Sequence, residues 1–241
     1  TDPNSYLVMV RSRDDGKTWQ KASSFPGVPN MTYVSRVVAS KHSEGTVYVT
    51  LDGHRSNDFK PYILKSTDYG KTWTSMSGNL PVNGSVQVIR EHPRTPTLLF
   101  AGTEFGAFYS SNGGTSWSKL PNNLPTVAVH DIVIQPREND LVIGTHGRGI
   151  YILDDITPLE KMAEASAAGP AYLFPAKAVT LYNENGSFPG GRGAAAEGER
   201  TFSAPNPAFG SALTYYIRDS VPKGQQVSLA IYDSTGAKIR N

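Results

Sequence analysis

The feature that most constrains the fold is an eight-residue segment that occurs three times. In residues 66–73, Asp68 and Gly70 stand where a tight connection between antiparallel strands needs an oxygen that accepts backbone N–H bonds and a residue that tolerates positive φ. Trp73 then places a large apolar surface at the start of the next strand. Residues 12–19 match this segment at every defining position, and residues 110–117 match it with Asn for Asp and Ser for Thr. The repetition predicts a series of similar β-hairpins.

The residues that define these segments are expected to have structural roles. The Asp or Asn closes the turn, the Gly takes the left-handed conformation, and the Trp covers the corner. The set is Asp14, Gly16, Trp19, Asp68, Gly70, Trp73, Asn112, Gly114 and Trp117. Each segment has too few converging oxygens for a calcium site, and Asn112 can keep the turn bonds without a charge. We therefore interpret the segments as turns and not as metal ligands.

The spacing of the segments predicts how the strands are grouped. Trp73 and Trp117 lie 44 residues apart, and Gly102-Thr103 and Gly144-Thr145 lie 42 residues apart. Short β-rich runs and turn residues fill each interval. A period of this length with four strands per repeat is typical of a β-propeller blade. The sequence predicts an all-β fold, a partial β-propeller of about three four-stranded blades over residues 1–157.

The repeat ends after residue 157, and the character of the chain changes. Thr157 as cap and Pro158 in the first turn predict a short helix to about Ala168, within a linker over residues 158–170. Alternation then returns, which predicts a partial β-sandwich over residues 171–241. The chain lacks an initial Met, so we expect a segment of something longer. Open blade edges would pair with the remaining blades of a longer chain or lead to self-association.

Charge and cysteine content narrow the classes of partner. With 23 Lys and Arg against 21 Asp and Glu, the formal charge of +2 gives no electrostatic case for nucleic acid or an anionic membrane. No apolar run reaches about 18 residues, so we expect no membrane span. The absence of cysteine excludes disulfides and thiolate metal sites and favours a bacterial exported or cytosolic protein. No motif indicates a cofactor, and we expect none.

The S-x-D-x-G-x-T-W pattern resembles the Asp-box, or BNR repeat, of sialidase-like and sortilin-like (VPS10-type) β-propellers. Residues 139–155 also resemble the last blade of large bacterial proteins with a sortilin-like propeller, often labelled glycosyl hydrolase, and residues 231–236 resemble the sandwich that follows it there. The resemblance implies export to the periplasm or beyond. Asp-boxes occur on binding proteins as well as on glycosidases, so the resemblance leaves the chemistry open.

Strand order predicts which residues share a face. In a four-stranded antiparallel blade, the third-to-fourth turns lie on one rim, and the second-to-third loops and blade-to-blade connections lie on the other. The repeated corners therefore occupy one rim, and we expect ligand binding on the opposite rim. The residues expected there are His54, Arg55, Asp58, Glu104, Phe105, His130, Asp131, His146 and Arg148. Six of them form the predicted ligand-binding set, namely His54, Arg55, Phe105, His130, His146 and Arg148.

Two catalytic hypotheses remain open beside simple binding. A glycoside hydrolase needs two carboxyl groups, and Glu104 with Asp131 is the best pair, with Asp155 as the other partner for Glu104. Asp131 also begins an inner strand, where capping of backbone N–H groups is its simplest role. A sialidase needs three convergent arginines, and no spacing selects three from the candidates Arg36, Arg55, Arg90 and Arg148.

A metal site is the remaining alternative on this rim. His130, His146 and Glu104 have suitable ligand atoms, but no close histidine spacing supports a site, and we expect none. Arg148 between two glycines lacks the helix start of a phosphate loop and is expected to line a groove or pair with Asp154 or Asp155. The leading prediction is a non-catalytic glycan- or peptide-binding or scaffold module. The alternative is a glycoside hydrolase of sialidase-like or endo-glucanase-like type.

Overall fold

The computed structural model describes residues 9–12, 14–22, 25–120, 123–179 and 210–240. The chain divides into two units, residues 1–163 and residues 164–241, and each is described by itself. The first unit carries the predicted propeller segment. The boundary between the units falls inside the stretch that the sequence predicts to be a linker.

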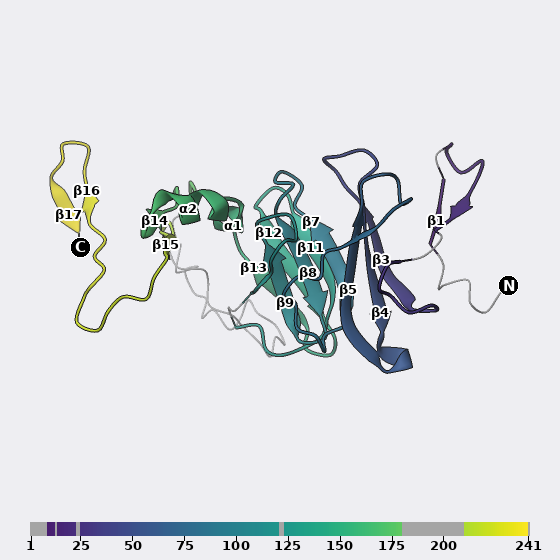
Figure 1. Cartoon of the computed structure of the whole chain (residues 1–241). Helices are drawn as coiled ribbons and strands as arrows, with labels where there is room; N and C mark the ends of the chain where they lie inside the picture. Colours follow the sequence, from purple (N-terminus) through teal and green to yellow (C-terminus); the bar gives the residue numbers. More distant parts are fainter. Residues whose placement is uncertain (1–8, 13, 23–24, 121–122, 180–209, 241) are drawn as a thin grey trace, which may run out of the picture. The chain divides into compact units, whose positions relative to one another are not determined.

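In the described part of the first unit, three antiparallel sheets of three or four strands follow one another along the chain (Figure 1). The first has the order β3 (Tyr33–Ala39), β4 (Val47–Gly53), β5 (Asp58–Ser66) and β6 (Thr74–Ser75). The second has β7 (Val86–Glu91), β8 (Leu99–Thr103), β9 (Gly106–Ser110) and β10 (Ser118–Lys119) in the matching order. The third has three strands, β11 (Val129–Gln135), β12 (Asp140–Thr145) and β13 (Ile150–Leu153). A hairpin of β1 (Val10–Arg11) and β2 (Gln20–Lys21) precedes them.

The sheets pack face to face, because their central strands are apolar on both faces. In β4, Tyr48 belongs to the core shared with the second sheet, and its neighbour Val49 belongs to the core shared with the N-terminal hairpin. In β8, Leu99 faces the first sheet and Phe100 the third. This alternation is the pattern of a blade buried between two others. The predicted all-β fold, a partial propeller, is confirmed, with two blades of four strands and one of three.

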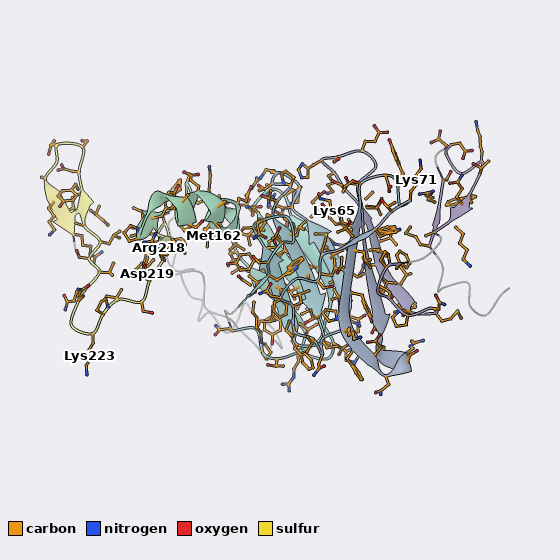
Figure 2. All side chains as sticks on the ribbon, in the orientation of Figure 1. Lys65, Lys71, Met162, Arg218, Asp219 and Lys223 are labelled. Carbon is orange, nitrogen blue, oxygen red and sulfur yellow. The ribbon has the colours of Figure 1, made fainter. Side chains whose placement is uncertain are left out.

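The three repeated segments close in the same way, as turns held by their own side chains. The carboxylate of Asp68 accepts from the backbone N–H and the hydroxyl of Thr72, at 2.9 and 2.7 Å, and from Ser66 Oγ at 2.8 Å. Ser66 Oγ in turn accepts from the N–H of Gly70 at 2.7 Å, where φ is +77°. The segments at 12–19 and 110–117 repeat these bonds, through Asp14 and Asn112 respectively. Lys71, labelled in Figure 2, lies in the middle segment.

The tryptophans of these segments differ in burial. Trp117 is 4% exposed and donates its indole N–H to the Met76 carbonyl at 2.8 Å, and Trp73 is 7% exposed and meets the ring of Phe25 edge-on at 5.3 Å. Trp19 is 62% exposed, and its indole N–H donates to Gly16 of its own turn. The second and third tryptophans therefore join a turn to the preceding sheet or hairpin, and Trp19 contacts its own corner.

Helices α1 (Thr157–Glu160) and α2 (Met162–Ala168) follow the third sheet. The prediction that Thr157 caps this helix is wrong, because α1 begins at Thr157 itself and the residue at its N-cap is Ile156, which makes no side-chain cap bond. The Thr157 hydroxyl instead donates to Asp155 at 2.5 Å. The side chain of Ile156 is buried in the core between the second and third sheets, which anchors the start of the helix.

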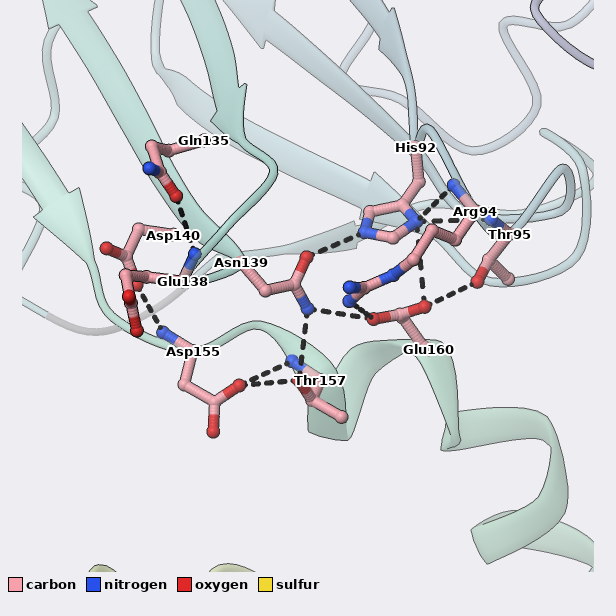
Figure 3. Close-up of polar contacts among 10 residues, drawn as sticks. All are labelled: His92, Arg94, Thr95, Gln135, Glu138, Asn139, Asp140, Asp155, Thr157 and Glu160. Atoms are coloured by element: carbon pink, nitrogen blue, oxygen red, sulfur yellow. Dashed lines mark hydrogen bonds and ion pairs between the residues drawn. The ribbon is translucent and has the colours of Figure 1, made fainter. Parts of the chain in front are cut away.

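A buried polar network ties α1 to the turns of the second and third sheets (Figure 3). The His92 side chain is fully buried, its Nε2 lies 3.0 Å from Asn139 Oδ1, and its Nδ1 accepts from the backbone N–H groups of Arg94 and Thr95. Glu160 accepts from Arg94, Thr95 and Asn139 at 2.7 to 2.8 Å. Burial alone would raise the pKa of Glu160, but these bonds and the nearby positive charge hold it below its ordinary value.

In the second unit, the described residues form two small hairpins. They are β14 (Ala171–Leu173) with β15 (Tyr215–Ile217), and β16 (Ile231–Tyr232) with β17 (Lys238–Arg240). Arg218 and Asp219, labelled in Figure 2, form an ion pair of 3.1 Å just after β15. Of the predicted β-sandwich over residues 171–241, residues 180–209 and 241 lie outside the described residues.

Candidate ligand-binding site

A cavity of about 690 Å³ lies on the rim opposite the repeated corners. Each of the three sheets contributes to it, through second-to-third-strand loops and the starts of the innermost strands. The lining residues are Tyr33, Asp52, His54, Arg55, Gln87, Glu104, Ala128, His130 and His146. Five of them, His54, Arg55, Glu104, His130 and His146, are rim residues expected from the sequence.

Three equivalent irregularities in the innermost strands shape the cavity wall. The pairing register shifts at Ser35 in β3, at Gln87 in β7 and at His130 in β11, so each strand has a bulge near its start. A bulge leaves one residue out of the ladder and re-aims its side chain. Gln87 and His130 line the cavity, and Ser35 instead donates to the Val86 carbonyl of the next sheet at 2.8 Å.

Asp52 and His54 form a tight pair at the end of β4. Asp52 is 3% exposed and accepts from the backbone N–H of His54 at 3.0 Å, and its other oxygen lies 2.5 Å from His54 Nδ1. Burial alone would raise the pKa of Asp52, but hydrogen bonds from the His54 backbone, the Gln87 amide and the His54 ring hold it below its ordinary value. The ionised carboxylate only accepts, so Nδ1 carries the hydrogen.

The Gln87 amide links two carboxylates. Its Nε2 donates to Asp52 Oδ2 at 2.9 Å and to Glu104 Oε1 at 3.2 Å. One nitrogen therefore bridges two acidic groups from neighbouring blades.

The remaining lining residues interact in two pairs. The Arg55 guanidinium lies 5.9 Å from the centroid of the Tyr33 ring, which is a cation–π arrangement. The rings of His130 and His146 lie 5.0 Å apart with a tilt of 32°, and the His146 N–H donates to the Ala128 carbonyl at 2.9 Å. These pairs orient side chains of the first and third blades along the cavity wall.

Asp131 lies outside the lining of the cavity and holds an ion-pair cluster among the three innermost strands. Its Oδ1 accepts from Arg36 of β3 at 3.1 Å and from Arg90 of β7 at 2.9 Å. The same oxygen accepts from the N–H of Ile132, and Arg36 also donates to the His130 carbonyl at 3.4 Å. Two of the arginines considered for a sialidase-type site thus pair with one aspartate.

Three other expected rim residues also lie outside the lining of this cavity. Phe105 is exposed and donates its backbone N–H to Thr103 Oγ1, and Arg148 is exposed in the loop between β12 and β13. Asp58 accepts from the Tyr62 hydroxyl at 2.6 Å. Burial, together with the bond to Asp58 and its negative charge, raises the pKa of Tyr62 to about 12.

Sequence reasoning missed Tyr33, Asp52 and Gln87. The spacing of Asp52 two residues before His54, at the end of a strand, is a signal that could have found Asp52. Gln87 reaches the cavity because of its bulge, and no local pattern indicates that bulge. Among the described residues, no group of three or more His, Asp or Glu side chains is arranged to hold a metal ion. In the same part of the chain, no helix has the length and apolar character needed to cross a membrane.

Stacked antiparallel sheets with repeated corners on one rim and a cavity lined from all three sheets on the other define a β-propeller segment. Residues 8–149 match the family model described as "Sortilin, neurotensin receptor 3". The chain belongs to this Sortilin-Vps10 family. The comparison with curated proteins found no match.

Similar solved structures include two glycoside hydrolases of family GH74 and a YCF48 protein. An ancestral GH74 enzyme has 27% identity and a TM-score of 0.40, covering 48% of this chain and 14% of that one. The GH74 enzyme of Niastella koreensis has 23% identity and a TM-score of 0.42, covering 52% and 22%. YCF48 from Cyanidioschyzon merolae has 19% identity and a TM-score of 0.44, covering 63% and 47%. The chain thus spans less than half the length of each of these structures.

Proposed function

We propose that this chain is a non-catalytic recognition module that binds a glycan or peptide in the cavity lined by Asp52, His54, Glu104 and His130. The observation that carries the proposal is the composition of the cavity wall. Hydrogen-bonding side chains from three blades converge on one space of about 690 Å³, a volume suited to a few sugar or amino-acid units.

The state of Asp52 supports binding over catalysis by this residue as a general acid. General acid catalysis needs a carboxyl group that stays protonated near neutral pH. Asp52 is the most buried acid of the cavity, and its pKa is lowered because its hydrogen bonds outweigh the effect of burial. Its hydrogen bonds therefore stabilise the ionised carboxylate, and Asp52 is unsuited to donate a proton as a general acid.

Retention of the full chain on glycan and peptide arrays tests this proposal. We expect binding that Glu104→Ala and His130→Ala each reduce, and that Arg137→Ala, on the opposite rim, leaves unchanged. Arg148→Ala serves as the second comparison, because Arg148 was expected to bind ligand but lies outside the cavity lining. Binding that neither cavity substitution affects would remove the proposal.

A glycoside hydrolase is the second candidate, favoured by the Gln87 bridge between Asp52 and Glu104. Asp52 and Glu104 are therefore the carboxylates to test. They take the place of the pair Glu104 and Asp131 expected from the sequence, because Asp131 does not line the cavity. Ionised Asp52 would serve as base or nucleophile, and Glu104 would have to supply the proton. Release of reducing ends from oligosaccharides, abolished by Asp52→Asn and by Glu104→Gln, would establish this activity. Hydrolysis that survives both substitutions would exclude the pair.

We also propose that another β-sheet covers the outer face of the third blade. Val133, Val142 and Ile152 are paired across β11, β12 and β13, and Ile152 is 61% exposed. The corresponding surface of the second blade is buried against the third. Further blades of a longer chain, or a second copy, would bury this row. A monodisperse monomer of the isolated chain by light scattering would contradict self-association.

Export from a bacterial cell is the remaining part of the proposal. It rests on the resemblance of residues 139–155 to exported bacterial propellers. Fractionation of the producing cells, followed by detection of the protein with an antibody, is the direct test. A protein found only in the cytoplasmic fraction would contradict export.

A further inference from the structure

The two linked carboxylates of the cavity have no lysine or arginine partner among the described residues, and the one ion-pair contact is that of Asp52 with the His54 ring. Asp52 accepts from the backbone and ring of His54 and from Gln87, and Glu104 accepts from the same Gln87 nitrogen. Among the described residues, no lysine or arginine forms an ion pair with either of them. Asp131, in contrast, pairs with both Arg36 and Arg90. Two negative charges close together and partly removed from water are costly unless a positive charge neutralises them.

The imidazole of His54 adds an acceptor to the same wall. Because Nδ1 carries the hydrogen that faces Asp52, Nε2 of the neutral ring is an unprotonated acceptor. His54 lines the cavity, and its side chain is 46% exposed, so a ligand can reach Nε2. Asp52 is thus a positioning residue that sets the tautomer of His54.

The cation nearest to these groups along the chain is directed elsewhere. Arg55 follows His54, and its guanidinium lies over the ring of Tyr33. It lines the cavity without forming an ion pair to Asp52 or Glu104. A cationic ligand would therefore be repelled by Arg55 and attracted by the carboxylates. An anionic ligand would be attracted by Arg55 and repelled by the carboxylates.

The site favours a cation on a flexible stem. Asp52 is almost fully buried, so the groups of this wall that a ligand meets are the Glu104 carboxylate and the His54 ring. A lysine side chain places a compact ammonium with three donors on a flexible four-carbon stem, and that stem can pack against apolar surface such as Ala128 and the Tyr33 ring. The amine of an amino sugar, by contrast, is attached directly to a bulky ring.

Building on the proposed function of this cavity, we propose that its ligand is a peptide whose lysine side chain enters it. The ammonium donates to the Glu104 carboxylate and to Nε2 of His54, above the buried Asp52. Glu104 and His54 are then the residues that select the ligand, and Gln87 holds the two carboxylates in place.

Calorimetric titration of the full chain with three blocked pentapeptides tests the inference. The peptides differ only in their central residue, which is lysine, Nε-acetyl-lysine or glutamate. We expect the lysine peptide to bind and the other two to bind at least about tenfold more weakly, since acetylation removes the charge. Glu104→Gln should weaken lysine-peptide binding about tenfold, and the matched control Glu138→Gln should leave it unchanged. Circular dichroism melting checks that each variant is folded.

Binding by the Arg55→Gln variant shows whether the site prefers a cationic or an anionic ligand. Tighter binding of the lysine peptide by Arg55→Gln supports the inference, and weaker binding overturns it, with Arg137→Gln as the control. Preferred binding of the glutamate peptide, or of chitosan oligomers or neutral glycans over all peptides, also overturns it while the proposed function stands. Failure of every glycan and peptide to bind removes the proposed function itself.

Independently, ¹⁵N NMR should show the Nδ1–H tautomer of His54, and the Nε2–H tautomer would contradict the proposed acceptor.

Discussion

The terminal methyl of Met76 lies over Gly114 so closely that a Cβ on Gly114 would stand 2.1 Å from it. Met76 directly follows β6 of the first blade, and Gly114 belongs to the corner after β9 of the second blade. The carbonyl of Met76 also accepts the indole N–H of Trp117. Met76 therefore contacts both the glycine and the tryptophan of the next blade's turn, the first through its terminal methyl and the second through its carbonyl.

Gly114→Ala should destabilise the protein more than Gly113→Ala. Both glycines have positive φ, +69° at Gly113 and +88° at Gly114, so both substitutions strain the backbone. A Cβ at Gly113 meets nothing within 4 Å, so the difference isolates the collision with Met76. We expect Gly114→Ala to lower the free energy of unfolding by roughly 1–3 kcal/mol more than its neighbour, measured in urea. Equal losses would show that Met76 moves aside freely.

Asp68→Ala should lower the melting temperature more than Asp68→Asn. Alanine removes every bond that the carboxylate accepts from Ser66, Lys71 and Thr72. Asparagine can keep the turn, as Asn112 does in the third segment, where Oδ1 accepts from the Ser116 N–H and Nδ2 donates to the Ser116 hydroxyl. Calorimetric melting of both variants is the measurement, and equal shifts would contradict this account of the turn.

Stability should fall as the solution is acidified below about pH 4.5. The pKa values of Asp52, Asp68 and Glu160 are lowered in the folded protein from ordinary values of 3.8, 3.8 and 4.5. The unfolded chain then binds more protons than the folded one, so the stabilisation is present above these ordinary values and is lost as pH falls through the lowered ones. Urea unfolding between pH 6 and pH 2 measures it, and Asp68→Asn should flatten the curve. A stability that rises with acid would contradict the prediction.

His92→Leu should destabilise the first unit by about 1–3 kcal/mol, because it leaves buried polar groups without partners. The backbone N–H groups of Arg94 and Thr95 lose their acceptor, and Asn139 Oδ1 loses its contact with the ring (Figure 3). His92→Gln keeps both an acceptor and a donor in its side-chain amide and should cost less. Arg137→Gln, on an exposed side chain, should change stability by less than about 0.5 kcal/mol in the same urea titration.

Asp131→Asn should reduce stability by about 1 kcal/mol, and 1 M salt should reduce this difference, because the ion pairs with Arg36 and Arg90 are partly exposed. Urea titrations at low and high salt measure both effects. A variant with unchanged stability that had lost glycan cleavage would instead support the catalytic role expected from the sequence.

The blade order could be predicted from the sequence because the eight-residue corners are local. The Ser, Asp and Gly positions fix each turn through bonds within the segment, and the 44-residue spacing of the tryptophans then orders the strands. The same parity argument placed His54, Glu104 and His146 on one rim, and the structure brings them to one cavity. Local chemistry and strand count sufficed for these statements.

The details of the cavity depend on contacts that no local pattern contains. Gln87 reaches Asp52 because β7 has a bulge at that position, and Asp131 is drawn to Arg36 across two sheets. The exposure of Trp19 likewise depends on which neighbour packs against its turn, since its segment matches that of buried Trp73 at every defining position. Such outcomes are set by register and by inter-sheet packing, which act over tens of residues.

Because every corner closes through side chains of its own segment, a duplicated stretch of gene would carry its turn with it. The faces of the added sheet must still pack against its neighbours, as the methionine seated on a glycine does. The row of sheets can thus lengthen or shorten during evolution without a new kind of turn. Diversification is then left to the far rim, where His54, Glu104 and His146 already differ from one copy to the next.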